Sequence, residues 1–195
     1  MSNRALLIAS LFLAVIHPSF AEDTGSKAVQ LEPASGNVSF EAIGRPSMLK
    51  IKGKGTALKG SLKVSGAKVT GSSTFELNSL ETGLSMRDKH MKEKYLETEK
   101  YPQAKLTLTE LTLPESAQKA IFTSEKIPFK GVMSLHGVNK PVEGIADLSR
   151  SGSGYTVIAT FPIKTPDFAI ATPSFAGITL ADNVTVTVEF AAPVK

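Results

Sequence analysis

The chain has 195 residues, no cysteine and a formal net charge of +4. These values exclude disulfides, a thiol nucleophile and a lipidated cysteine, and the length fits a single domain that buries its own core. The lysines are scattered among acidic residues, and no basic block with interleaved aromatic residues occurs. Nucleic-acid binding requires a concentrated basic footprint, so we expect no nucleic-acid partner.

The N-terminal segment predicts a signal peptide over residues 1–21. Arg4 supplies the positive start, an unbroken apolar run covers Ala5 to Ile16, and small residues stand at Ser19 and Ala21. The apolar run is shorter than the ~20 residues that a membrane-spanning helix needs. We therefore expect export to the periplasm and cleavage after Ala21, with no transmembrane anchor left; a retained anchor is the alternative.

Residues 36–195 are predicted to form one β domain, preceded by a flexible leader over residues 22–35. Apolar and polar residues alternate with a period of two, which is typical of antiparallel strands with one buried face and one wet face. Short glycine-containing turns between the runs favour a sandwich or a barrel. The apolar positions of these runs are Val38, Phe40 and Ala42; Phe75 and Leu77; Leu106 and Leu108; Phe129, Met133 and Leu135; Tyr155, Val157, Ala159 and Phe161; and Val184, Val186, Val188 and Phe190.

One of these runs changes phase. Leu106 and Leu108 are followed by Leu111 and Leu113, so the apolar positions shift by one residue. An extra residue in one strand of an antiparallel pair produces such a shift. The sequence therefore predicts a β-bulge after Leu108.

A segment rich in helix-forming residues, Ser85 to Glu99, interrupts the strand pattern. Ser85 and Asp88 have the spacing of a capping box, and Tyr101-Pro102 forces extended backbone beyond the segment. We therefore predict one short helix near residues 86–98, lying over a barrel opening or against the barrel wall. One side of this helix carries, four residues apart, Arg87, Met91 and Tyr95.

No recognisable catalytic or metal-binding motif follows the predicted signal peptide. His90 and His136 do not have the spacing of a metal-binding HExxH motif, and no GxSxG nucleophile elbow occurs. His136 adjoins Gly137 at a predicted turn, where a hydrogen bond to backbone is the simpler expectation. We expect no catalytic residues, no metal, no cofactor and no enzymatic activity.

An apolar barrel interior is sufficient to bind a hydrocarbon chain. Burying one CH2 group contributes about 0.8 kcal/mol, so about a dozen such groups give a gross ~10 kcal/mol. After the costs of association, this still permits about micromolar binding. A barrel of ~8 strands is also narrow enough to be filled by its own side chains. The strand pattern alone leaves the hollow and the filled barrel open.

Two blocks of the sequence resemble the YceI-like family of periplasmic proteins. The second block is Gly131 to Val142, and the first comprises Thr82-Gly83, Arg87-Asp88, His90-Met91, Tyr95-Leu96, Tyr101-Pro102 and Ala104. The resemblance implies a lipocalin-like antiparallel barrel of about eight strands with a helical segment, often dimeric, that binds polyisoprenoid chains or other long amphiphiles. The chain departs from the family in having no tryptophan, Leu106 in place of a frequent aromatic residue and Asn139 in place of the usual threonine. These departures bear on the shape of the pocket.

Our leading hypothesis is a periplasmic carrier for a polyisoprenoid, a quinone or a fatty-chain lipid held in the barrel interior. Arg87 and His90 are candidates to contact a polar head group. One rival is a stress-related interaction module with a filled barrel and no ligand, and another is an enzyme that uses His90 and His136 for proton transfer. The expected ligand-binding residues are Phe40, Phe75, Met91, Tyr95, Phe129, Met133, Tyr155, Phe161 and Phe190.

Overall fold

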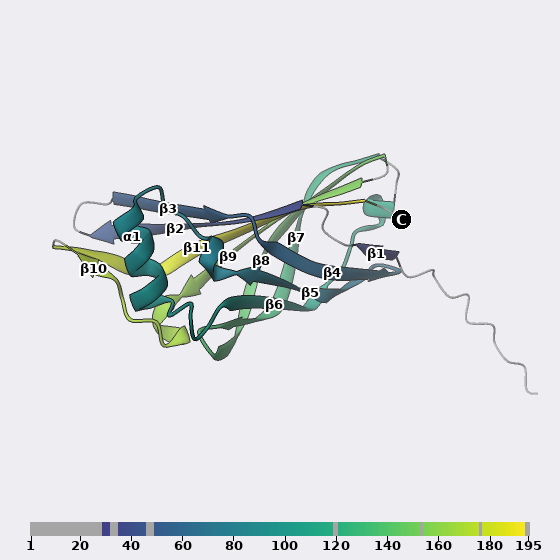
Figure 1. Ribbon diagram of the computed structural model, residues 1–195. Coiled ribbons are helices and arrows are strands. Elements are labelled where there is room, and N and C mark those ends of the chain that lie inside the picture. Colours follow the sequence, from purple (N-terminus) through teal and green to yellow (C-terminus); the bar gives the residue numbers. More distant parts are fainter. Residues whose placement is uncertain are drawn as a thin grey trace, which may run out of the picture.

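The computed structural model describes residues 29–31, 35–45, 49–118, 121–152, 154–175 and 177–193. Within these residues the chain forms one antiparallel sheet of eleven strands (Figure 1). The predicted signal peptide lies outside the described residues. The strands are β1 Val29–Leu31, β2 Ser35–Arg45, β3 Leu49–Gly55, β4 Leu58–Ser65, β5 Lys68–Glu76, β6 Gln103–Leu111, β7 Ile121–Leu135, β8 Val138–Ser151, β9 Gly154–Lys164, β10 Ser174–Phe175 and β11 Ile178–Pro193.

The sheet curls into a half-barrel because its two ends are consecutive in the chain. The strand order is β1-β4-β5-β6-β7-β8-β9-β11-β2-β3, so β3 and β4 stand near opposite ends of the path. Only Thr56 and Ala57 separate these two strands, and Ala57 forms a parallel bridge with Gly36 at the start of β2. Reciprocal backbone hydrogen bonds of 2.9 and 2.8 Å between Lys54 and Glu81 cover part of the β3 edge. The predicted all-β barrel class is confirmed.

Side chains along each strand alternate between the interior and the outer wall. Strand β9 is the clearest case, because Val157, Ala159, Phe161 and Ile163 are buried while the residues between them are exposed. The predicted bulge is confirmed, since the pairing of β6 with β7 shifts register between Leu108 and Glu110. The segment expected to be a flexible leader also contributes β1, which pairs with β4.

In the residues that the structure describes, four short 3-10 or π-helical segments and one α-helix connect the strands. These are η1 Leu77–Ser79, α1 Ser85–His90, the π-helical η2 Met91–Tyr95, η3 Glu115–Gln118 and η4 Thr165–Phe168. Figure 1 shows α1 at one end of the barrel, beside the ends of β3 and β10. In the described part of the chain, no helix is long and apolar enough to cross a membrane.

The helix begins and ends differently from the prediction. Its N-cap residue is Leu84 and no side chain caps it, because the Asp88 carboxylate instead accepts a 2.8 Å hydrogen bond from the backbone N–H of Thr82. The predicted capping box is therefore absent. The last turn widens into a π-helix that ends at Tyr95, and Glu97 then takes a positive φ of 45°. The helical stretch thus stops before residue 98.

Candidate ligand-binding cavity

The interior of the barrel contains a cavity of about 600 Å³. This volume lies within the range of small-molecule binding pockets. The lining is almost entirely apolar, and polar side chains are few. The lining residues are Val38, Phe40, Ala42, Leu49, Ile51, Leu58, Ser73, Phe75, Leu77, Leu80, Thr82, Leu84, Ser85, Met86, Arg87, His90, Met91, Tyr95, Leu96, Ala104, Leu106, Met133, Leu135, Phe161, Ile163, Thr165, Ile170, Pro173, Ser174, Ile178, Leu180, Ala181, Val184, Val186 and Val188.

The cavity opens at the end of the barrel that carries α1. Leu49, Leu84 and Met86 line the cavity and are nevertheless 46%, 59% and 68% exposed. Residues with both properties define the rim of the mouth. The hydroxyl of Tyr95 in η2 lies 3.4 Å from the backbone oxygen of Ser174 and 3.3 Å from its nitrogen, which links the helical segment to β10 at this mouth.

Eight of the eleven residues predicted as ligand contacts or head-group contacts line the cavity. They are Phe40, Phe75, Arg87, His90, Met91, Tyr95, Met133 and Phe161. Phe129, Tyr155 and Phe190 do not line it. Phe129 and Phe190 are 2% and 7% exposed within the packed core, and the Tyr155 hydroxyl lies 3.4 Å from the backbone oxygen of Ala117. Strand alternation places all three inside the barrel, but at the end that side chains fill.

Several lining residues escaped the sequence analysis because they lie in the segments between strands. Leu80 follows η1, Leu84 precedes α1, Met86 lies in the first turn of α1, and Ile170 follows η4. Apolar residues in a connecting segment give no period from which burial can be inferred. No local signal marked these residues, because the apolar content of the segment from residue 77 to 86 is close to the 42% of the whole chain.

Polar side chains of α1 and of the loop before it hold the mouth together. Arg87 donates from Nε to the Thr82 hydroxyl at 2.7 Å and from Nη2 to the Thr82 carbonyl at 2.7 Å. The Thr82 hydroxyl in turn donates to the Asp88 carboxylate. The guanidinium group therefore contacts threonine rather than a carboxylate, and it fixes the loop that leads into the helix.

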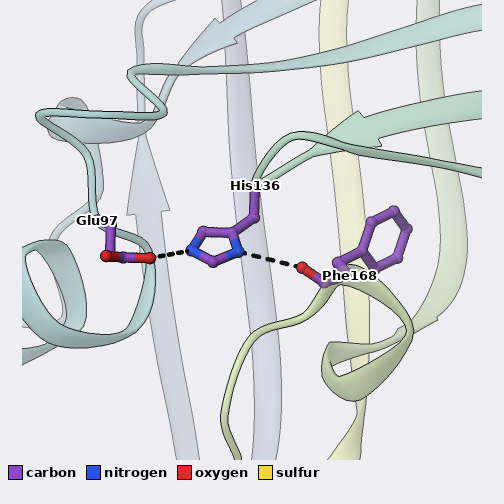
Figure 2. A network of polar contacts seen from close by, with 3 residues as sticks. All are labelled: Glu97, His136 and Phe168. Carbon is purple, nitrogen blue, oxygen red and sulfur yellow. Dashed lines mark hydrogen bonds and ion pairs between the residues drawn. The ribbon is translucent and has the colours of Figure 1, made fainter.

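His136 is buried at the β7–β8 turn and joins two segments beside the mouth (Figure 2). Its Nδ1 lies 3.1 Å from the carbonyl oxygen of Phe168, and its Nε2 lies 2.8 Å from a carboxylate oxygen of Glu97. A carbonyl oxygen only accepts hydrogen bonds, so Nδ1 donates to Phe168. We call His136, Glu97 and Phe168 the histidine clamp.

Backbone strain gathers at the histidine clamp. Three non-glycine residues among those described have positive φ: Glu97 at 45°, His136 at 51° and Ala169 at 56°. Each is a clamp residue or directly follows one. Residues in this region of φ persist only where their surroundings enforce it. The clamp thus holds the chain after η2 and the chain after η4 in place, and both segments carry residues that line the mouth.

Tyr101 completes the packing around the clamp. Its ring centroid lies 4.4 Å from that of His136, at an interplanar angle of 54°. Lys100 lies over the Tyr101 ring at 4.9 Å, and its pKa is raised above the ordinary value, chiefly by its interactions with the Tyr101 hydroxyl and then by the charge of Glu97. His136 itself does not line the cavity. Its role is structural, and the hydrogen bond to backbone that the sequence led us to expect is the one to the Phe168 carbonyl.

The arrangement favours binding an apolar chain over chemical transformation. Among the residues that the structure describes, no group of three or more histidine, aspartate or glutamate side chains is arranged to hold a metal ion. Polar side chains reach the cavity mainly at its mouth, through Thr82, Ser85, Arg87 and His90. A hydrocarbon placed deeper would meet apolar walls and would be stabilised by removal from water.

The fold recurs in solved structures. A polyisoprenoid-binding domain from Saccharophagus degradans, implicated in plant cell wall breakdown, superposes with a TM-score of 0.65 at 18% identity, covering 86% of this chain and 98% of that domain. BcnA of Burkholderia cenocepacia gives a TM-score of 0.65 at 19% identity, covering 80% of this chain and 96% of BcnA. The YceI protein of Campylobacter jejuni gives 0.60 at 19% identity, covering 74% and 85%. The chain therefore has the half-barrel fold of these proteins.

Sequence comparison then gives the family. The YceI-like domain matches residues 30–192, and the chain belongs to this family. The UPF0312 protein plu2095 of Photorhabdus laumondii is 38% identical over 102 residues, which is 49% of this chain and 48% of that protein. The match thus spans about half the length of this relative. The resemblance inferred from the two sequence blocks is confirmed.

Proposed function

We propose that this protein binds and carries a long-chain amphiphile, such as a polyisoprenoid, a quinone or a fatty-chain lipid, in the periplasm. The observation that carries the proposal is the cavity of about 600 Å³ with its nearly continuous apolar lining. Each buried CH2 group contributes about 0.8 kcal/mol, and walls of this kind present few unpaired polar groups that a hydrocarbon would leave desolvated. The polyisoprenoid-binding domain of Saccharophagus degradans, which shares the fold, supports the same class of ligand.

The ligand enters tail first and leaves its head at the mouth. The deep walls are apolar, whereas Thr82, Ser85, Arg87 and His90 lie where the cavity meets solvent. Arg87 has five N–H donors, and the bonds to Thr82 engage two of its nitrogen atoms. A hydroxyl, carbonyl or phosphate head group placed at the mouth would therefore find hydrogen-bond donors close to the rim.

Two other functions fit the geometry less well. A ligand-free interaction module requires a barrel filled by its own side chains, but filling is limited to the end around Phe129 and Phe190. An enzyme that uses both histidines requires them in one site. His90 lines the mouth, whereas His136 lies outside the cavity with both ring nitrogens in polar contacts. A carrier function requires neither condition.

The test is to identify what the protein carries. Full-length protein is expressed with its N-terminal segment, purified from the periplasmic fraction and examined by native mass spectrometry and lipid extraction. We expect a bound amphiphile, and after delipidation we expect rebinding of long-chain prenols, quinones or fatty amides. Protein that is repeatedly empty, and that binds none of these compounds after delipidation, would refute the proposal.

A matched pair of variants ties binding to the cavity. Met133 lines the cavity and its neighbour Val132 is 37% exposed on the outer wall of the same strand. Met133→Gln places an amide against the bound chain, and we expect at least a tenfold loss of affinity because the amide is desolvated without a partner. Val132→Gln should bind like the unmodified protein. Equal affinities in the two folded variants would place the ligand elsewhere.

A further inference from the structure

We propose that two aromatic rings in edge-to-face contact, Phe161 and Phe129, form a floor that limits the length of hydrocarbon chain that the cavity accepts. This inference rests on the proposed function, because it defines the substrate class of the same cavity. Phe161 lines the cavity and is 1% exposed. Phe129 lies behind it, 2% exposed and outside the lining, with the ring centroids 5.9 Å apart at an interplanar angle of 86°.

The floor belongs to a row of paired residues that runs around the barrel at one level. In this row large side chains stand beside glycines, which leave room for the rings. A Cβ atom on Gly144 would lie 2.8 Å from Cε1 of Phe129 and 2.7 Å from Cβ of Phe161, and a Cβ on Gly53 would lie 2.3 Å from Cε1 of Phe40. The paired residues of the row are Leu111 with Phe129, Phe129 with Gly144, Phe161 with Val186, Val186 with Phe40, and Phe40 with Gly53.

The interior of the barrel differs on the two sides of this row. Below the floor, buried side chains fill the interior and do not line the cavity; these are Ile127, Ala146, Leu148, Val157 and Phe190. On the β2–β11 side, one further pair, Val38 and Val188, still lines the cavity, so the floor slopes. The cavity is therefore a dead end that closes at the aromatic rings, rather than a tunnel through the barrel.

The floor gives the cavity a finite depth. Leu180 lies near the mouth and Val186 lies in the row of the floor, and their partners on β2 are Gly44 and Phe40, four residues apart. At the usual rise of a strand this separation is about 13 Å. A chain short enough to fit gains about fourfold in affinity for each CH2 group that it buries. The remaining carbons of a longer chain stay in water at the mouth of the cavity and add nothing to the affinity.

The experiment measures affinity against chain length. Delipidated full-length protein is titrated with linear prenols of two to eight isoprene units, all with the same hydroxyl head, by native mass spectrometry. For the unmodified protein we expect the affinity to rise with each unit and then to level off within the series. A rise that continues to the longest prenol would overturn the inference while leaving the proposed function intact.

Three variants test whether the rings set that limit. Phe129→Ala removes the ring behind the floor and leaves the lining residues unchanged. The affinity should then level off at a chain length at least one isoprene unit longer. Val186→Phe fills empty space at the level of the floor, so the affinity should level off at a chain length at least one isoprene unit shorter. Leu148→Ala removes a buried side chain further below the floor, 6% exposed and outside the lining, and should leave the chain length at which affinity levels off unchanged.

The outcomes separate the inference from the function on which it rests. The inference is overturned if the affinity levels off at the same chain length in the folded Val186→Phe and Phe129→Ala variants as in the unmodified protein. If Phe129→Ala does not fold, Val186→Phe decides the matter alone, because it adds a ring rather than removing one. Protein that binds no prenol, quinone or fatty amide of any length would overturn the proposed function and the inference together.

Discussion

The two ends of the barrel are made from the same strands but have different interiors. On β9, Val157 and Ala159 pack into the filled end, while Phe161 and Ile163 face the cavity. Both ends show the same alternation of buried and exposed residues. The two interiors differ because of the side chains that lie across the barrel at each level and because of the segments that lie at the opening. Alternation therefore determines which residues lie inside a barrel, whereas the depth of a cavity depends on packing across it.

The largest expected effect compares equally buried rings at the two ends. Phe190 in the filled end is 7% exposed and Phe75 at the cavity wall is 5% exposed. Phe190→Ala should lower the free energy of unfolding by about 3–5 kcal/mol, and Phe75→Ala by only about 2 kcal/mol, because part of the Phe75 ring already faces empty space. Chemical denaturation of the two ligand-free variants measures both values. Equal losses would show that the two ends are packed alike.

A smaller loss of stability is expected when the histidine clamp is removed, because the clamp supports only the end of the barrel that contains the cavity, the hollow end. Asparagine tolerates a positive φ, so His136→Asn removes the contacts to Glu97 and Phe168 without adding backbone strain. We expect a loss of about 2 kcal/mol, because the buried carbonyl oxygen of Phe168 loses its hydrogen bond from His136. Hydrogen exchange should show reduced protection in residues 96–101 and 166–170. Unchanged protection there would mean that Tyr101 and the surrounding packing hold the mouth without the clamp.

The clamp also shows which features are readable from sequence. Strands, the bulge after Leu108 and the helix come from local patterns of a few residues, and they were predicted. His136 lies 39 residues from Glu97 and 32 from Phe168 along the chain, so no local pattern joins them. The same limit applies to the cavity. Phe129 and Phe161 both follow the inward alternation, yet only one lines the cavity, because that depends on contacts between strands.

The helix illustrates a prediction that was correct in kind and wrong in detail. Helix-forming residues predicted a short helix over a barrel opening or against the barrel wall, and the structure has it at one end of the barrel. The capping box failed because the Asp88 carboxylate accepts a hydrogen bond from Thr82, three residues before the start of the helix. Arg87 also bonds to Thr82, so two charged side chains anchor the loop that leads into the helix. These contacts to the preceding loop override the capping pattern of Ser85 and Asp88.

The smallest expected effect concerns the outer wall of the hollow end, where Glu41 joins β2 to β3. Its carboxylate lies 3.3 Å from Nζ of Lys52 and 3.4 Å from Nζ of Lys50, and its side chain is 33% exposed. Hydrogen bonding from Lys52, followed by the charge of and a hydrogen bond from Lys50, holds the pKa of Glu41 below its ordinary value. A carboxylate with a lowered folded-state pKa stabilises the fold above its unfolded-state pKa and loses that contribution as the pH falls through the folded-state pKa.

The unfolding midpoint of Glu41→Gln should therefore lie slightly below that of the unmodified protein at neutral pH, and the two should converge in the acid range. Because the pair is exposed, salt should reduce the difference at neutral pH. Glu189 on β11, which pairs with Asn37 and Ile158 rather than with a lysine, offers Glu189→Gln as a control at the filled end. Denaturant unfolding across the acid range measures both differences. A Glu41→Gln difference that stays constant with pH would mean that the cross-strand pair contributes nothing to the hollow end, and that its outer wall, like its interior, depends on packing alone.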